Sequence, residues 1–217
     1  MGKYAAVVLV LDGCSSRALE EAETPHIDEI SEEGARTLEC KSVCPSATYT
    51  AHCSIVTGAY PEVHGIVGNR FYERGRRIVV DFDLEDANRY VLSETLFEAL
   101  AGTKVAVGEP IDRGADVSVS KDEVQSRALR ERDEYAIERA LELAKLYEPV
   151  LLVVNLPGID RVGELYGPLS EELVYHLEEV DRLVGEFEKA LGGVYDDYLL
   201  VVVACLLYTS PSPRDRG

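Results

Sequence analysis

Residues 44–69 read CPSATYTAHCSIVTGAYPEVHGIVGN and combine a short helical segment with a loop that contains glycine and histidine. Thr48 stands where the helix is expected to begin, and Gly58 is expected to end it. A hydroxyl at a helix N-terminus faces unpaired N–H groups and the positive end of the helix dipole, which favours anions. The segment is therefore a candidate for a nucleophile that meets an anionic substrate. The simpler interpretation, that Ser46 or Thr48 only caps the helix, is the one these residues alone favour.

Length and charge limit the functions that the chain can have. It has 217 residues, enough for one α/β domain with a substantial core. The net charge is −18, from 40 acidic and 22 basic residues. A face that binds a nucleic-acid polymer needs an excess of cations, so this composition argues against such a partner. Handling an anionic ester in so acidic a domain fits bound metal ions, although solubility alone explains most of the charge.

The cysteines and the hydropathy pattern bear on the compartment. The chain has five cysteines, an odd number, and their spacing matches no zinc motif. Reduced thiols in a cytoplasmic protein are the expected state. The N-terminus shows no cleavage region of a signal peptide, and no apolar run is long enough to span a membrane. No feature indicates an oligomeric state.

The order of apolar runs predicts an α/β fold. Buried strands are expected at residues 4–11, 104–107, 150–156 and 198–204, and a further strand at 36–43. Residues 71–82 are typical of a hairpin, and residues 108–130 indicate only loop and a short helix. Caps and apolar periodicity predict helices at 25–33, 131–147 and 170–191. The prediction is a mostly parallel central sheet with helices on both faces and a site at the strand ends.

The segment 44–69 resembles the nucleophile region of the type I phosphodiesterase/nucleotide pyrophosphatase family, within the alkaline phosphatase superfamily. Members of the family read Pro-Ser-x-Thr-aromatic-x-x-His, then Thr-Gly-x-x-Pro-x-x-His-Gly-Ile, then Asn. The match has no gap and comprises Pro45, Ser46, Thr48, Tyr49, His52, Thr57, Gly58, Pro61, His64, Gly65, Ile66 and Asn69. The resemblance implies that Thr48 is the nucleophile and that Asn69 binds a phosphoryl oxygen. It makes His52 and His64 residues that order the loop.

Two further segments extend the resemblance to metal ligands. The family has an Asp-Gly pair at the end of its first strand, which here is Asp12-Gly13, and the resemblance implies that Asp12 and Thr48 bind the same ion. After a later strand the family has Asp-x-x-Gly-His-x-x-Gly-Pro. Asp160 matches the Asp, but Glu164 stands where the family has His. Glu164 is either a ligand with an altered metal preference or the mark of a weakened second site, and we favour the first.

The C-terminal residues depart from the family. In the family, the strand that corresponds to residues 198–204 leads into Ser-Asp-His-Gly, and the Asp and His of that motif complete the first metal site. Here it leads into CLLYTSPSPRD, for which one codon series spells a transposase-end sequencing adapter. We expect residues 1–204 to be the N-terminal part of an alkaline phosphatase-like catalytic domain and residues 205–217 to be a non-native tail. The metal centre of the chain as written is then incomplete, and the chain is expected to be weakly active or inactive.

For the intact parent protein the resemblance implies a metal-dependent phosphoric ester hydrolase that acts on a phosphodiester or a nucleotide pyrophosphate through a phosphothreonine intermediate on Thr48. The implied cofactors are two divalent ions, zinc first, with manganese or magnesium as alternatives because of Glu164. The implied partner is a small phosphate ester or nucleotide. Two alternatives stay open: a phosphonoacetate hydrolase-like enzyme, which residues 56–69 resemble equally well, and a noncatalytic binding domain that has kept the fold.

Overall fold

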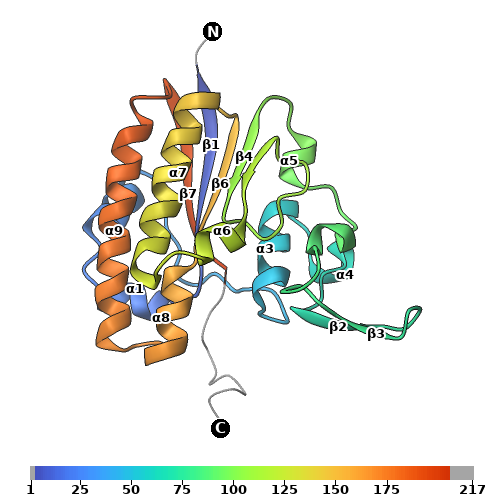
Figure 1. Ribbon diagram of the computed structural model, residues 1–217. Helices are drawn as coiled ribbons and strands as arrows, with labels where there is room; N and C mark the ends of the chain where they lie inside the picture. Colours follow the sequence, from blue (N-terminus) through green and yellow to red (C-terminus); the bar gives the residue numbers. More distant parts are fainter. Residues whose placement is uncertain (1–2, 206–217) are drawn as a thin grey trace.

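The computed structural model describes residues 3–205. Its main sheet has five strands in the order β5-β4-β6-β1-β7, and every strand pair in it is parallel. Strand β1 lies between β6 and β7 (Figure 1). Its residues Ala6 and Leu11 pair with Leu151 and Leu156 of β6. The strands are β1 (Tyr4–Leu11), β4 (Lys104–Val107), β5 (Val117–Val119), β6 (Leu151–Leu156) and β7 (Asp197–Ala204).

Helices cover both faces of this sheet, as predicted, and each face has its own apolar core. The first core packs alternate residues of β1, such as Leu9, against the long helices. The helices of the first face are α1 (Ser16–Glu21), α2 (Pro25–Glu33), α6 (Lys121–Gln125), α7 (Arg132–Tyr147), α8 (Gly158–Tyr166) and α9 (Glu171–Leu191). A short 3₁₀ turn, η2 (Leu129–Glu131), leads into α7.

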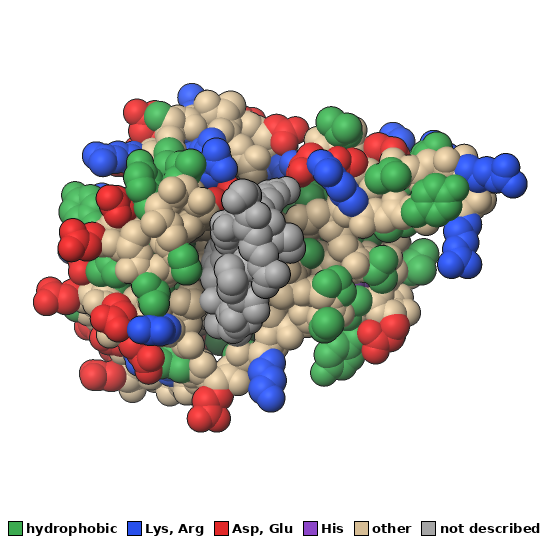
Figure 2. All heavy atoms as spheres, turned by 90° about the horizontal axis from the view of Figure 1, so that it is seen from below, with side chains coloured by type: hydrophobic (Ala, Val, Ile, Leu, Met, Phe, Trp, Pro, Cys, Tyr) green, Lys and Arg blue, Asp and Glu red, His purple; other side chains and the backbone are tan. Residues whose placement is uncertain are grey.

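The second core lies under the segment that contains the candidate nucleophile. Val10 and Val153 face it from the sheet. The elements of this face are α3 (Thr48–Thr57), α4 (Pro61–His64), α5 (Leu96–Ala99), η1 (Ala87–Tyr90) and a separate hairpin of β2 (Arg70–Glu73) and β3 (Ile78–Asp81). Exposed apolar side chains gather on this part of the molecule, at the right of Figure 2, and include Tyr60, Val63, Tyr72 and Val79.

The local signals predicted most elements well. Gly58 ends α3 with a left-handed φ of 63°, and Ser170 caps α9, where its Oγ accepts the Leu173 N–H at 3.2 Å. The strand predicted at residues 36–43 is wrong. Within residues 3–205 this segment joins no sheet ladder and most of its side chains are exposed. Its alternating polar and apolar residues imitate a strand, but a strand forms only where a neighbouring ladder accepts its backbone groups.

Asp181 shows how the helices of the first face are joined. Its side chain lies on α9 and is 2% exposed. Oδ1 accepts the Ile27 N–H at 2.8 Å, and Oδ2 accepts the His26 N–H at 3.2 Å. The carboxylate therefore caps the N-terminus of α2 from another helix, whereas Thr24 makes no side-chain capping bond.

We expect Asp181→Ala to lower the free energy of unfolding by about 2 kcal/mol, because the buried Ile27 N–H and the partly buried His26 N–H lose a charged acceptor. Urea denaturation measures this change. The control is Asp28→Ala, which removes an exposed ion pair with Arg36 and should cost less than about 0.5 kcal/mol. Equal losses in both variants would contradict this account of Asp181.

Candidate functional site

Thr48 is the first residue of α3. The N-cap is Ala47, whose extended backbone starts the helix, and α3 has no side-chain capping hydrogen bond. The interpretation of Ser46 or Thr48 as a simple N-cap is therefore wrong. The next backbone N–H, of Tyr49, donates to Oδ1 of Asn69 at 3.2 Å. This bond ties the loop after α4 to the start of α3 and brings Asn69 next to Thr48.

Asp12 lies at the carboxyl end of β1 and is 4% exposed. Its backbone N–H donates to the carbonyl of Leu156 on the neighbouring strand, at 3.2 Å. Gly13 follows with a φ of +77°. A Cβ atom on Gly13 would lie only 2.5 Å from Cα of Asp160. The Asp-Gly pair thus has a structural reason, since only glycine lets the first turn of α8 approach the end of β1 so closely.

We expect Gly13→Ala to destabilise the fold by about 3 kcal/mol or more, because the methyl group overlaps the backbone of α8 and the left-handed φ disfavours alanine. Gly58→Ala is the matched control: Gly58 also has a left-handed φ, +63°, but nothing lies within 4 Å of its added Cβ. It should cost only about 1 kcal/mol. Thermal denaturation of both variants tests the difference, and a similar loss in the two would rule out the overlap with α8.

Asp160 and Glu164 both lie on α8, four residues apart and therefore on the same side of the helix. A guanidinium N–H of Arg161 donates to Oε2 of Glu164 at 2.7 Å. The sequence predicted only that this motif follows the strand at 150–156. The structure shows that it forms helix α8, which carries both carboxylates to the carboxyl edge of the sheet.

All five predicted site residues line one cavity of about 380 Å³. They come from four parts of the chain: the end of β1, the start of α3, the loop after α4 and helix α8. Charged groups of both signs surround the cavity, since Asp83, Lys121, Arg132 and Arg161 also contribute to its lining. The predicted residues that the structure brings together are Asp12, Thr48, Asn69, Asp160 and Glu164.

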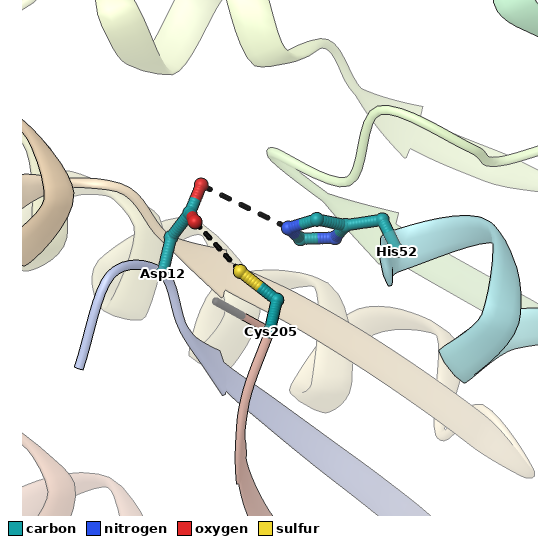
Figure 3. Close-up of side chains that lie close together, drawn as sticks. All are labelled: Asp12, His52 and Cys205. Atoms are coloured by element: carbon teal, nitrogen blue, oxygen red, sulfur yellow. Dashed lines mark hydrogen bonds and ion pairs between the residues drawn. The ribbon is translucent and has the colours of Figure 1, made fainter. Parts of the chain in front are cut away.

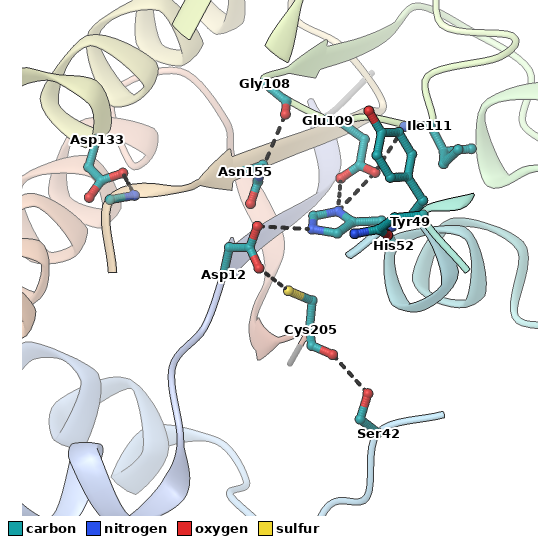
Figure 4. A network of polar contacts seen from close by, with 12 residues as sticks. Asp12, Ser42, Tyr49, His52, Gly108, Glu109, Ile111, Asp133, Asn155 and Cys205 are labelled. Carbon is teal, nitrogen blue, oxygen red and sulfur yellow. Dashed lines mark hydrogen bonds and ion pairs between the residues drawn. The ribbon is translucent and has the colours of Figure 1, made fainter. Parts of the chain in front are cut away.

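Behind Asp12 lies a buried pair, His52 and Glu109, both with fully buried side chains (Figure 4). The two oxygens of Glu109 lie 2.8 and 3.0 Å from Nδ1 of His52, and Nε2 of His52 lies 3.8 Å from Oδ2 of Asp12. Burial alone would lower the pKa of His52, but Glu109 first, then Cys205 and Asp12, outweigh it and hold the pKa well above its usual value. The Glu109 carboxylate thus fixes the His52 ring, whose Nε2 lies on the side of Asp12 and has no hydrogen-bond partner among residues 3–205.

His64 orders the loop after α4, as the resemblance implied. Its Nδ1 accepts the Ile66 N–H at 3.1 Å, and its Nε2 lies 2.9 Å from Oγ of Ser54. Burial lowers its pKa. The neutral ring thus orders the loop between α4 and β2.

Sequence reasoning missed Asn155, which lies in β6 and lines the cavity. Its Nδ2 donates to the carbonyl of Gly108 at 3.4 Å, and its buried Oδ1 has no hydrogen-bond partner among residues 3–205. A polar residue inside an otherwise apolar strand was the available signal. A buried carbonyl oxygen at a cavity with carboxylates suits a cation, because hard divalent ions prefer oxygen ligands.

Cys205 also approaches Asp12, and its thiol donates to Oδ1 at 2.6 Å (Figure 3). One ligand atom each from Asp12, His52 and Cys205 lie within 4.8 Å of one another, a spacing that a metal ion could bridge. Burial raises the pKa of the Cys205 thiol to about 12. The sequence from about residue 205 is expected to be non-native. The site described below therefore excludes Cys205.

The site thus combines carboxylates with a hydroxyl at a helix start, all at the carboxyl edge of a parallel sheet. The sequence model of one family matches almost all of the residues that form this arrangement. The type I phosphodiesterase / nucleotide pyrophosphatase family matches residues 6–204. The chain belongs to this family. Its relatives are enzymes of this type, and the family's members depend on metal ions.

Two curated relatives show the range of the similarity. The chain is 29% identical over 196 residues to an uncharacterised pyrophosphatase/phosphodiesterase of Schizosaccharomyces pombe. The aligned region covers 85% of this chain and 40% of that protein. It is also 29% identical over 172 residues to human ectonucleotide pyrophosphatase/phosphodiesterase family member 1. Here the aligned region covers 74% of this chain and 18% of that protein. The chain thus spans less than half the length of these relatives.

Solved structures share the fold. Murine ectonucleotide pyrophosphatase/phosphodiesterase 5, in an inactive threonine-to-alanine variant with AMP, superposes with a TM-score of 0.82 at 18% identity, covering 97% of this chain and 59% of that chain. Phosphonoacetate hydrolase from Sinorhizobium meliloti 1021 superposes with a TM-score of 0.66 at 21% identity. The superposition covers 87% of this chain and 54% of that chain. Within residues 3–205 none of the helices combines the length and hydrophobicity that a membrane crossing requires.

Proposed function

We propose that the whole protein hydrolyses phosphoric esters, and specifically phosphodiesters or nucleotide pyrophosphates, through Thr48. The observation that carries this proposal is the convergence of Thr48, Asn69 and three carboxylates on one cavity. Family membership supports the reaction class, and the AMP bound to the murine relative supports a nucleotide as substrate.

In this mechanism the Thr48 hydroxyl gives its proton to solvent and its oxygen forms a bond to phosphorus in line, while the P–O bond to the ester oxygen on the opposite side breaks and that oxygen leaves with the electron pair, to be protonated by solvent. Asn69, whose side-chain oxygen accepts the Tyr49 N–H, directs its NH₂ group to a non-bridging oxygen, and the N–H groups of the first turn of α3 stabilise the same charge. Water then hydrolyses the phosphothreonine ester, which restores the hydroxyl.

The residues present fit a divalent cation. Asp12, Thr48, Asp160 and Glu164 supply oxygen atoms around one cavity, and we propose them as the ligands of two divalent ions, zinc first and manganese or magnesium as alternatives. When bound, such ions neutralise charge on the phosphoryl oxygens and the leaving group.

The direct test is hydrolysis of bis(p-nitrophenyl) phosphate by the full-length parent protein, with and without EDTA. The proposal predicts turnover that EDTA abolishes and that Mn²⁺ or Zn²⁺ restores. Release of acetate and phosphate from phosphonoacetate, without diesterase turnover, would favour the phosphonoacetate hydrolase-like alternative, which the fold similarity keeps open. The absence of both activities would favour a noncatalytic domain.

Glu164→His separates the two interpretations of Glu164. If Glu164 is a ligand, the parent protein with Glu164 should be active, and the histidine variant should shift its preference from Mn²⁺ towards Zn²⁺ by about tenfold, since imidazole suits zinc. The ratio of turnover with the two metals measures this shift. Rescue of an otherwise inactive parent by histidine would instead identify a decayed second site.

We also propose a cytoplasmic location. The four cysteines before residue 205 are free, and Cys14 and Cys53 among them are buried, which fits a reducing compartment. Alkylation of the protein in freshly lysed cells should label Cys40 and Cys44 without a prior reductant, and a bond between these two exposed thiols would contradict the proposal.

A further inference from the structure

Asp133 joins three helices outside the cavity. It lies on α7 and is 1% exposed. Its Oδ1, on the side chain labelled Asp133 in Figure 4, accepts the backbone N–H of Gly158, the first residue of α8, at 2.9 Å. Its Oδ2 lies 2.8 Å from Nε2 of His176 on α9. Both oxygens of this buried carboxylate are thus engaged, one with the first turn of α8 and the other with a histidine that holds it in place.

The backbone of α8 lies close to both side chains of the pair. A Cβ atom on Gly158 would lie 2.1 Å from Oδ2 of Asp133 and 2.4 Å from Nε2 of His176. The backbone of α8 therefore rests directly on the pair, and only glycine permits this approach.

The opposite side of α8 is equally close to β1. As described above, a Cβ on Gly13 would lie 2.5 Å from Cα of Asp160. The first turn of α8 is thus held between the end of β1 and the pair formed by Asp133 and His176. Asp160 follows Gly158 by two residues, and Glu164 lies on the next turn. A rotation or shift of α8 would therefore move both carboxylates out of the cavity together.

We propose that Asp133 and His176 are positioning residues that fix the first turn of α8 and so direct Asp160 and Glu164 into the cavity. Neither residue lines the cavity itself. The inference rests on the proposed function, because it assigns the two residues a role in cation binding by that site. It adds residues from α7 and α9 that belong to none of the family motifs recognised in the sequence.

Hydrogen exchange in the 217-residue chain tests the contact with α8. Asp133→Ala should accelerate exchange of the Gly158 amide by about tenfold or more, since its acceptor is lost, and leave the amides of α2 unchanged. Asp181→Ala is the matched control, because Asp181 is also a buried aspartate that accepts N–H groups of a helix start, at His26 and Ile27. It should accelerate exchange in α2 and leave α8 unchanged.

Mn²⁺ binding tests positioning. In calorimetric titrations Asp133→Ala should weaken Mn²⁺ binding by about tenfold, while Asp181→Ala should stay within about twofold of the wild type. Asp133→Asn retains an oxygen for the Gly158 N–H and should restore most of the affinity. Gly158→Ala leaves Asp133 intact but pushes α8 away from it, so it should weaken binding as Asp133→Ala does, and it serves if Asp133→Ala fails to fold.

The outcomes are distinguishable. Faster exchange at Gly158 together with weaker Mn²⁺ binding supports the inference. Unchanged exchange, or faster exchange with unchanged Mn²⁺ affinity, overturns it, since the pair would then have a structural role at most. If the wild-type chain binds no Mn²⁺ at all, the proposed cation site of this chain fails by itself, whereas faster exchange at Gly158 in Asp133→Ala would still show that Asp133 fixes the first turn of α8, and unchanged exchange there would overturn the inference independently.

Discussion

Thr48→Ala is expected to reduce phosphodiester hydrolysis by the full-length parent protein on the order of 10³-fold or more, because it removes the attacking oxygen. The structure places Thr48 at the first turn of α3, at the cavity and beside Asn69. Its hydroxyl takes no part in capping the helix, so the substitution should leave the free energy of unfolding almost unchanged. A large loss of activity with an intact fold is therefore the signature of a nucleophile rather than of a structural residue.

Thr57→Ala is the matched control for this prediction. Thr57 lies at the other end of the same helix, where its hydroxyl donates to the Cys53 carbonyl at 2.6 Å. Its loss should leave turnover within about twofold. Thr48→Ser should retain a measurable part of the activity, since serine supplies the same oxygen. If Thr48→Ala kept more than a tenth of the wild-type turnover, Thr48 could not be the nucleophile.

Asp12→Ala has the second large expected effect, a loss of about 100-fold or more in affinity for Mn²⁺. Asp12 follows the last residue of β1 and lines the cavity, with Nε2 of His52 3.8 Å from its Oδ2. Removal of this carboxylate takes an anionic oxygen ligand from the site, and no neighbouring carboxylate on β1 replaces it.

Isothermal titration with Mn²⁺ measures this effect. Asp116→Ala is a suitable control, since Asp116 pairs with Lys104 at 2.8 Å and does not line the cavity. It should bind Mn²⁺ as the wild type does. Equal affinities for Asp12→Ala and the wild type would exclude Asp12 as a ligand.

The comparison of sequence and structure shows which signals are local. The strand at 4–11 and the helix after Ser170 were predicted because a continuous apolar run and a cap followed by an apolar stripe identify such elements without knowledge of the fold. The wrong strand at 36–43 and the missed strand β5 depend on which ladder accepts them, and no local pattern records that.

The same distinction holds in the site. Asp12, Thr48, Asn69 and Asp160 stand in motifs that the sequence displays, and the structure brings them to one cavity. The pairing of His52 with Glu109 joins residues 57 positions apart. His52 lies in a helix that the sequence predicted, whereas Glu109 lies in a segment whose structure the sequence did not define. Such a contact exists only once the sheet has brought both segments together, so no spacing rule could have predicted it.

The boundary at residue 204 stays a prediction, because residues 206–217 lie outside the part of the chain that the structure describes. Resequencing the source locus through codon 204 and beyond tests it. Continuation into Ser-Asp-His-Gly would identify the tail as an adapter, and a genomic Pro/Ser-rich tail would contradict the two-ion proposal for this protein.

The most direct test of the central claim is an anomalous difference map from a crystal of the full-length parent protein grown with Mn²⁺. The account predicts peaks inside the cavity, about 2.2 Å from oxygen atoms of Asp12 and Thr48 for one ion and of Asp160 and Glu164 for the other. A map without peaks at these oxygens, or with its only peak elsewhere in the molecule, would contradict the assignment of this cavity as the metal centre.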